Sequence, residues 1–155
     1  GVDRLIRAWG AVPNNVKLLI YGKGSLEKQV RDAERKLGNI SYLGFASKED
    51  IHVSMLSSHF NVCFRFCDGI DERFFFPSKF FSVNCYPGFA LVNDFYGLPD
   101  GFRKTGMLVN QDLSNLSDLL TLRRDLLENK TRERQDYLCS TYRWSILFDE
   151  IVSNA

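Results

Sequence analysis

Apolar and polar positions follow one another along the chain in blocks that predict strands and helices in turn. Val16 to Tyr21 is a nearly continuous apolar run, and the turn Gly22-Lys23-Gly24-Ser25 follows it, which is typical of a strand buried on both faces of a parallel sheet. The next segment, from about Leu26 to Leu37, carries an apolar stripe at helical spacing among charged residues, and Gly38 ends it. A strand followed by a helix is therefore the repeating unit.

The same unit recurs along the rest of the chain. Ser47 and Asp50 have the spacing of a capping box, which predicts the start of a helix that reaches about Ser58. The expected strands are 16–21, 40–43, 60–66, 89–93 and 107–109, and the expected helices are 3–9, 26–37, 47–58, 78–86 and a helical region from 113 that breaks near Asn129 and ends with 144–152. This order predicts an α/β fold with a Rossmann-like parallel sheet, helices on both faces and a C-terminal helical segment.

Composition limits the classes of function. The chain has 155 residues, of which 45% are hydrophobic, enough for one well-packed domain over residues 1–155. Its 20 basic and 19 acidic residues give no electrostatic footprint for nucleic acid or an anionic membrane. The basic residues near the C-terminus alternate with acids and are expected on a solvated helix face: Arg123, Arg124, Lys130, Arg132 and Arg134. No apolar run approaches the roughly 20 residues of a membrane span, so we expect a cytoplasmic protein.

Several common kinds of site are disfavoured. The four cysteines contain no C-x-x-C pair, so we expect free thiols rather than a disulfide framework or a zinc site. No D-x-D-type acid cluster calls for a divalent metal, so we expect neither a metal nor a cofactor. His52 and His59 have no neighbouring nucleophile and are expected at a helix surface and a helix end. The pair Gly22 and Gly24 is too short for a dinucleotide fingerprint.

Ligands of open α/β sheets bind beyond the carboxyl ends of the strands. Four loops are expected to meet there: Gly22–Ser25, Leu43–Ser47, Cys67–Lys79 and Asn93–Tyr96. In the third loop Asp68, Asp71 and Glu72 precede a Pro-Ser-Lys helix start, where Ser78 is the expected cap and Lys79 lies in the first turn. Such a helix start suits a phosphate or a sugar oxygen, and an ordinary capped core helix is the alternative.

The order and spacing of five segments resemble a known family. These are GVDRLIRAW, KLLIYGKGSLEKQV, NISYLGFASKEDI, FFPSKFFSVNCYPGFALVN and TGMLV with the acid-rich helix after it. Together they resemble the C-terminal, nucleotide-sugar-binding domain of GT-B-type glycosyltransferases of the group-1, family-4-like kind. The resemblance covers nearly the whole chain. It implies that the domain's first strand and the N-terminal acceptor domain, which would be a partner of this surface, are absent from this sequence.

The resemblance also implies roles for particular residues. Gly22, Lys23 and Gly24 would lie beside the donor, and the turn Leu43-Gly44-Phe45 would meet the nucleotide base. Ser78 and Lys79 would meet the phosphates or the sugar. The glutamate that binds the ribose in this family would fall near Ser82, and the one that faces the sugar would fall near Phe74.

The chain departs from the family at both glutamate positions. A serine makes one weak hydrogen bond where a carboxylate makes two charge-assisted ones, so either Glu72 replaces the lost carboxylate as the catalytic candidate or donor binding is weakened. A non-catalytic, degenerate module used for protein contact is therefore the alternative to the donor-binding half of a hexosyltransferase-like enzyme. The rings Phe74–Phe76 are expected to be uncovered without the acceptor domain and to promote weak self-association.

Overall fold

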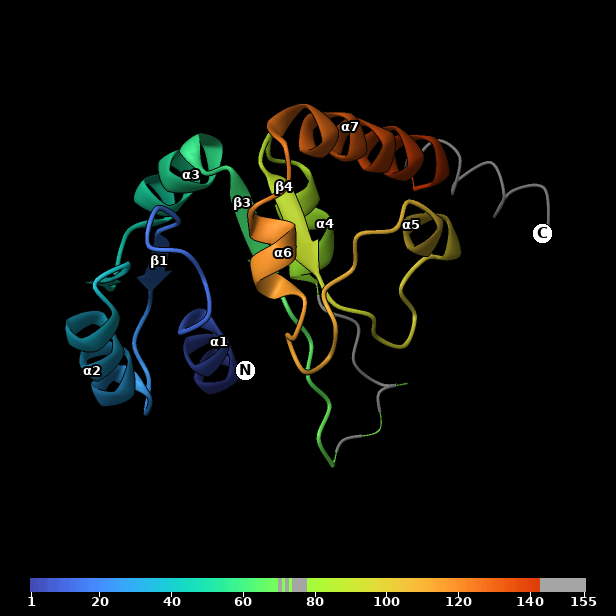
Figure 1. Ribbon diagram of the computed structural model, residues 1–155. Helices are drawn as coiled ribbons and strands as arrows, with labels where there is room; N and C mark the ends of the chain where they lie inside the picture. The colour runs from blue at the N-terminus through green and yellow to red at the C-terminus, as the bar shows by residue number, and fades with distance from the viewer. Residues whose placement is uncertain (70, 72, 74–77, 143–155) are drawn as a thin grey trace.

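A computed structural model of the protein describes residues 1–69, 71, 73 and 78–142, which form alternating helices and strands (Figure 1). The elements are α1 (Val2–Trp9), β1 (Leu18–Tyr21), α2 (Glu27–Leu37), β2 (Ile40–Gly44), α3 (Lys48–Ser57), β3 (Phe60–Cys63), α4 (Lys79–Asn84), β4 (Phe89–Val92), α5 (Asp100–Lys104), α6 (Leu116–Leu120) and α7 (Arg124–Thr141). Within this part of the chain every strand pair is parallel. The predicted α/β class, with alternating units and a long helix near the C-terminus, is confirmed.

The described strands form two parallel pairs and not one continuous sheet. β1 pairs with β2, with Leu18 opposite Ile40, and β3 pairs with β4, with Phe60 opposite Phe89. Figure 1 shows β1 and α2 on one side of the molecule and β3, β4 and α7 on the other. The expected strand at 107–109 is reduced to a single bridge between Asn93 and Val109. No described strand joins the two pairs, so β1 and β3 each keep one unpaired edge.

β4 is the most completely buried strand in the described residues, and its alternating side chains enter two different cores. Phe89 and Leu91 pack in a cluster that includes residues of α1, β1 and α6. Ala90 and Val92 pack in a second cluster that contains Phe80 of α4 and residues of α5 and α7. Because side chains of a strand point alternately to opposite faces, an all-apolar strand such as β4 needs cover on both sides. Helices on both faces supply it.

Local sequence signals set several helix ends as expected. The backbone N–H of Asp50 donates to Ser47 Oγ over 3.0 Å, and the backbone N–H of Ser47 donates to Asp50 Oδ2 over 3.4 Å, so the predicted capping box begins α3. α2 ends at Gly38, whose φ of 72° lies in the left-handed region. The predicted break near Asn129 is wrong, because α7 runs through it without interruption. The predicted helix at 144–152 lies outside the described residues.

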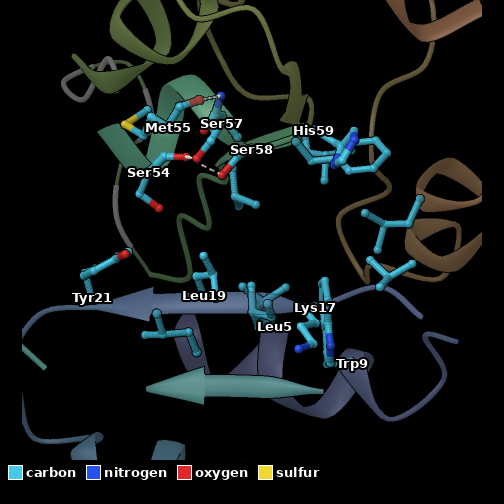
Figure 2. A pocket seen from close by; sticks show the side chains of 18 of the residues that line it. Leu5, Trp9, Lys17, Leu19, Tyr21, Ser54, Met55, Ser57, Ser58 and His59 are labelled. Carbon is cyan, nitrogen blue, oxygen red and sulfur yellow. Dashed lines mark hydrogen bonds between the residues drawn. The ribbon is translucent and has the colours of Figure 1, made fainter. Parts of the chain in front are cut away.

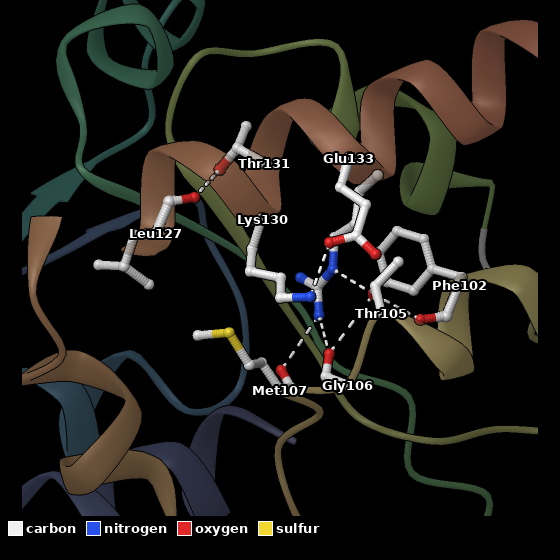
Figure 3. Close-up of polar contacts among 9 residues, drawn as sticks. Phe102, Thr105, Gly106, Met107, Leu127, Lys130, Thr131 and Glu133 are labelled. Carbon is white, nitrogen blue, oxygen red and sulfur yellow. Dashed lines mark hydrogen bonds and ion pairs between the residues drawn. The ribbon is translucent and has the colours of Figure 1, made fainter. Parts of the chain in front are cut away.

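Arg134 of α7 is buried, so its predicted place on a solvated face is wrong. It is 1% exposed, and its guanidinium donates to the carbonyl oxygens of Ala90 (2.9 Å) and Gly106 (2.6 Å) and to Thr105 Oγ1 (3.1 Å). Figure 3 shows Thr105, Gly106 and Met107 grouped beneath α7. Burial lowers the pKa of Arg134 to about 10, while the neighbouring Glu133 charge raises it. The side chain therefore ties α7 to β4 and to the segment after α5.

Candidate functional site

The carboxyl ends of β1 and β2 are joined through two glycines. Gly22 has a φ of 131° and Gly44 a φ of 66°, both in the region that favours glycine, and the Gly22 N–H donates to the Gly44 carbonyl over 2.7 Å. The Tyr42 hydroxyl donates to the Gly22 carbonyl over 2.6 Å. The register of β1 against β2 shifts between Ile20 and Tyr21, beside this junction. The backbone of two glycines is thus accessible at the carboxyl ends of the β1–β2 pair.

The residues that follow the two glycines, Lys23 and Phe45, bring a cation and an aromatic ring together. The Lys23 ammonium is 5.3 Å from the centre of the Phe45 ring, and Phe45 is 74% exposed. A ring so exposed contributes little to the core and offers a flat surface to a planar ligand. Gly24 and Ser25, which follow Lys23, are exposed as well, and no atom lies within 4 Å of where a Gly24 side chain would begin. Gly22, Lys23, Gly24, Gly44 and Phe45, which we call the glycine cluster, are therefore brought together as predicted.

Tyr42 is held beneath the glycine cluster by residues of α2. The Arg31 guanidinium lies 4.7 Å from the centre of the Tyr42 ring, and Arg31 donates to Glu27 over 2.9 Å. Burial raises the pKa of Tyr42, and the charge of Glu27 adds to the effect. The hydrogen bond from Arg31 lowers the pKa of Glu27. The Tyr42 hydroxyl therefore stays protonated at neutral pH and acts as a donor to the Gly22 carbonyl.

Ser78, Lys79 and Ser82 lie at and along α4, which packs against the β3–β4 pair. Ser78 and Lys79 line a pocket of about 580 Å³ together with Gly1, Cys63 and Phe66. None of the five residues of the glycine cluster lines this pocket. The two predicted groups of donor-binding residues thus belong to different strand pairs, which no described strand joins. Ser82 is exposed one turn further along α4.

Ser78 occupies the expected N-cap position of α4, but its side chain does not cap the helix. Ser78 has helical backbone angles, with φ of −54° and ψ of −28°, and its side chain makes no capping hydrogen bond to a described residue. A capping side chain normally requires extended backbone angles at the cap position. α4 has six residues, from Lys79 to Asn84, and is shorter than the predicted 78–86. The arrangement of donors that the sequence suggested for phosphate is therefore reduced to the exposed Lys79 and the Ser78 hydroxyl.

The acids of the loop before α4 are engaged by arginines where the structure describes them. Asp68 forms an ion pair with Arg4, whose guanidinium lies over the Phe66 ring at 4.8 Å. Asp71 pairs with Arg73 at 2.6 Å, and the hydrogen bonds from Arg73 lower the pKa of Asp71. No group of three or more possible metal ligands occurs among the described residues. The catalytic candidate Glu72 and the rings Phe74–Phe76 lie outside them.

Asn93, which follows the last residue of β4, has a structural role and does not lie on a surface loop. It is fully buried, accepts from the Arg65 N–H over 2.7 Å, and donates to the Arg65 carbonyl over 2.6 Å and to Gln111 Oε1 over 2.9 Å. The amide therefore extends the β3–β4 ladder beyond the last residue of β3. An amide directly after an all-apolar run was the one sequence signal for it. Asn93, the first residue of the expected ligand loop 93–96, is therefore buried and stabilises the fold.

Cys63 provides a chemical probe of the Ser78–Lys79 pocket. Burial raises the pKa of its thiol, while the nearby positive charge of Lys79 lowers it to a smaller extent. We expect iodoacetamide at pH 8 to alkylate Cys63 at least about tenfold more slowly than the exposed Cys85 and Cys139, as followed by peptide mass spectrometry. Removing the positive charge with Lys79→Ala should slow Cys63 further without changing Cys139. Equal rates at all three thiols would contradict this picture of the pocket.

Neither protein-family models nor curated proteins match this chain. None of the helices in the described part of the chain is long and apolar enough to cross a membrane. The proposed function therefore rests on the geometry of the described residues.

Proposed function

We propose that this chain is the donor-binding domain of a GT-B-type glycosyltransferase, which binds a nucleotide-diphosphate sugar. The glycine cluster carries the proposal, because it places an exposed aromatic ring, an ammonium group and accessible glycine backbone at the carboxyl ends of two parallel strands. A base could stack on Phe45 while backbone groups near Gly22 and Gly44 meet its edge. Alternating α/β units with parallel strands support the same assignment.

The proposed donor spans both groups of residues. The base lies at Phe45 and Lys23, and the diphosphate lies toward Ser78 and Lys79, whose side chains are exposed at the start of α4. In the intact enzyme the sugar passes from the nucleotide diphosphate to an acceptor hydroxyl during synthesis of a surface polysaccharide or related glycoconjugate. The protein would act by orienting the two substrates and by stabilising the charge on the leaving diphosphate. A separate N-terminal domain would bind the acceptor.

Comparing a nucleoside with its diphosphate tests this proposal. We expect Lys79→Ala to weaken binding of uridine or guanosine diphosphate about tenfold in calorimetry and to leave binding of the nucleoside unchanged. Phe45→Ala should weaken both ligands by a similar factor, because it removes the stacking surface. Lys28→Ala, which removes an exposed charge from α2, is the matched control and should change neither. Equal affinity of wild type and Lys79→Ala would remove Lys79 from the proposed site.

A non-catalytic contact module is the second candidate. Ser82 stands where the family has a ribose-binding glutamate, and Ser78 does not cap α4, so two of the expected donor contacts are weak. This module would show no saturable binding of either nucleoside diphosphate. Saturable binding that Phe45→Ala and Lys79→Ala both weaken favours the transferase domain.

A further inference from the structure

Two exposed thiols lie outside the sites described above. None of the four cysteines, all of which are within the described residues, lines the cavity of about 710 Å³ beside β1 and α3 that Figure 2 shows. Cys63 lines the Ser78–Lys79 pocket. Cys85, at the end of α4, and Cys139 of α7 are both exposed and free. Exposed thiols can react with disulfides in solution, so the placement of these two relative to each other decides what they can form.

α7 is joined to the chain on both sides of Cys85. Gln135 Nε2 donates to the carbonyl oxygens of Asn84 and Tyr86, in both cases over 3.0 Å. These two residues directly precede and follow Cys85. Figure 1 shows α4 below α7 and next to β4, and the two helices are in contact. The end of α4 therefore lies beside Gln135.

A pair of aromatic rings aligns the two helices further along. The centres of the Phe81 and Tyr142 rings are 5.4 Å apart, and the ring planes meet at 63°. Phe81 and Cys85 are four positions apart in the sequence, so they share one face of α4. Gln135 and Tyr142 are seven positions apart and share one side of α7 and its C-cap in the same way. The stretch from Phe81 to Cys85 therefore lies along the stretch from Tyr142 back to Gln135.

Cys139 belongs to this same side of α7. It is four positions after Gln135 and three positions before Tyr142, and residues at these spacings lie on one helix face. The contacts of Gln135 and Tyr142 direct that face towards α4. The Cys85 thiol donates to the Phe81 carbonyl over 3.3 Å, a contact within α4 on the face that Phe81 turns to α7. The two thiols are thus placed on facing sides of neighbouring helices.

We propose that Cys85 and Cys139 form a reversible disulfide, by exchange with low-molecular-weight disulfides, that joins the end of α4 to α7. The link would draw the last turn of α4 towards α7 until the two Cα atoms lie about 4.4–6.8 Å apart. Because α4 has only six residues, beginning with Lys79, the link would restrain the whole helix. The proposal does not depend on the donor assignment.

The reaction takes place in two exchange steps, for which oxidised glutathione is a suitable reagent. The thiolate of one cysteine attacks a sulfur of oxidised glutathione, forms a mixed disulfide and releases one glutathione thiolate. The thiolate of the second cysteine then attacks the protein sulfur of the mixed disulfide and releases the second glutathione. The two protein thiols lose two electrons and two protons, while oxidised glutathione is reduced to two glutathione molecules. Excess dithiothreitol reverses the change.

Peptide mass spectrometry after oxidation tests the pairing. Trypsin places the four cysteines on four different peptides, of which 80–103 carries Cys85 and 135–143 carries Cys139. After the full chain is treated with oxidised glutathione and free thiols are blocked, these two peptides should be joined in a protein of monomer mass that has lost two hydrogen atoms. Glutathione on both cysteines without a direct link would overturn the proposal. A link found only in species of dimer mass would overturn it as well.

Single variants separate reaction within the chain from ordinary thiol exchange. In Cys139→Ser the mixed disulfide on Cys85 has no partner thiol, so after free glutathione is removed it should persist at least about tenfold longer than in the wild type. Cys67→Ser removes a thiol outside the pair and is the matched control, which should behave as the wild type does. Equal lifetimes in the wild type and Cys139→Ser would contradict the pairing.

Thermal unfolding measures whether the link restrains α4. The disulfide closes a long loop between residues 85 and 139, which reduces the freedom of the unfolded chain. The linked protein should therefore melt at least about 4 °C higher than Cys139→Ser treated in the same way. Equal melting temperatures would show that the linked helix is not restrained, and the proposed effect on α4 would be wrong.

Discussion

Replacing Arg134 with methionine should lower the free energy of unfolding by about 3 kcal/mol. Methionine keeps most of the length of the side chain but removes every donor, so the carbonyls of Ala90, Gly106 and Met107 lose the partner that they have in the native protein. The stacking of the guanidinium on Phe89 and Phe102, at 4.2 and 4.4 Å from the ring centres, is lost as well. Urea denaturation with an unchanged m-value would measure the effect.

Two companion variants give this experiment its controls. Arg132→Met makes the same chemical change at an exposed position of the same helix, and we expect it to alter stability by less than about 0.5 kcal/mol. Arg134→Lys keeps the charge, but one ammonium group cannot reach all the acceptors of the planar fork, so it should fall between the other two. A loss for Arg134→Met no larger than that for Arg132→Met would show that the buried hydrogen bonds contribute nothing net.

Gly88→Ala should cost about 2 kcal/mol of stability. The added methyl group would lie 2.3 Å from the Ser58 carbonyl oxygen and 3.1 Å from the His59 carbonyl carbon, which are backbone atoms at the entry to β3. Because backbone cannot rotate out of the way as a side-chain end can, β3 and β4 would have to shift against each other. Thermal unfolding followed by circular dichroism measures the loss.

Gly24→Ala is the matched control for Gly88→Ala. Nothing lies within 4 Å of the position that its methyl group would take, so this change should leave stability within about 0.5 kcal/mol of the wild type. A melting temperature for Gly88→Ala equal to that of Gly24→Ala would mean that the backbone between α3 and β3 can shift at little cost in free energy.

The sequence predicted those features that depend on neighbouring residues. The apolar stripe of α2, the glycine after it and the reciprocal bonds of Ser47 and Asp50 all act within one or two turns, so their pattern is sufficient. Long-range packing is different. In the sequence Arg134 is one of several basic residues that alternate with acids along a helix. Its burial is explained only by contacts with distant residues, such as Ala90, which lies 44 positions earlier. Three of its four polar partners are backbone carbonyls, which the sequence does not distinguish.

The candidate site was predicted in part for the same reason. Gly22, Lys23, Gly44 and Phe45 come together because β1 and β2 are neighbours in a short βαβ unit, which periodicity alone predicts. The glycine cluster and Lys79 belong to different strand pairs, and no local pattern in the sequence predicts how the two pairs are arranged. The cap at Ser78 failed because its backbone continues the helical turn, a conformation that residue type does not decide.

The contacts of α7 with distant residues also limit the order in which the chain can assemble during synthesis. The β1–α2–β2 unit is complete once residue 44 has left the ribosome. The second core needs Leu138, and the carbonyls beside β4 need Arg134, so Phe80 and Phe102 stay uncovered until almost all of α7 has emerged. We expect nascent chains halted between residues 105 and 123 to present these rings to chaperones, and chains that extend past residue 142 to be released.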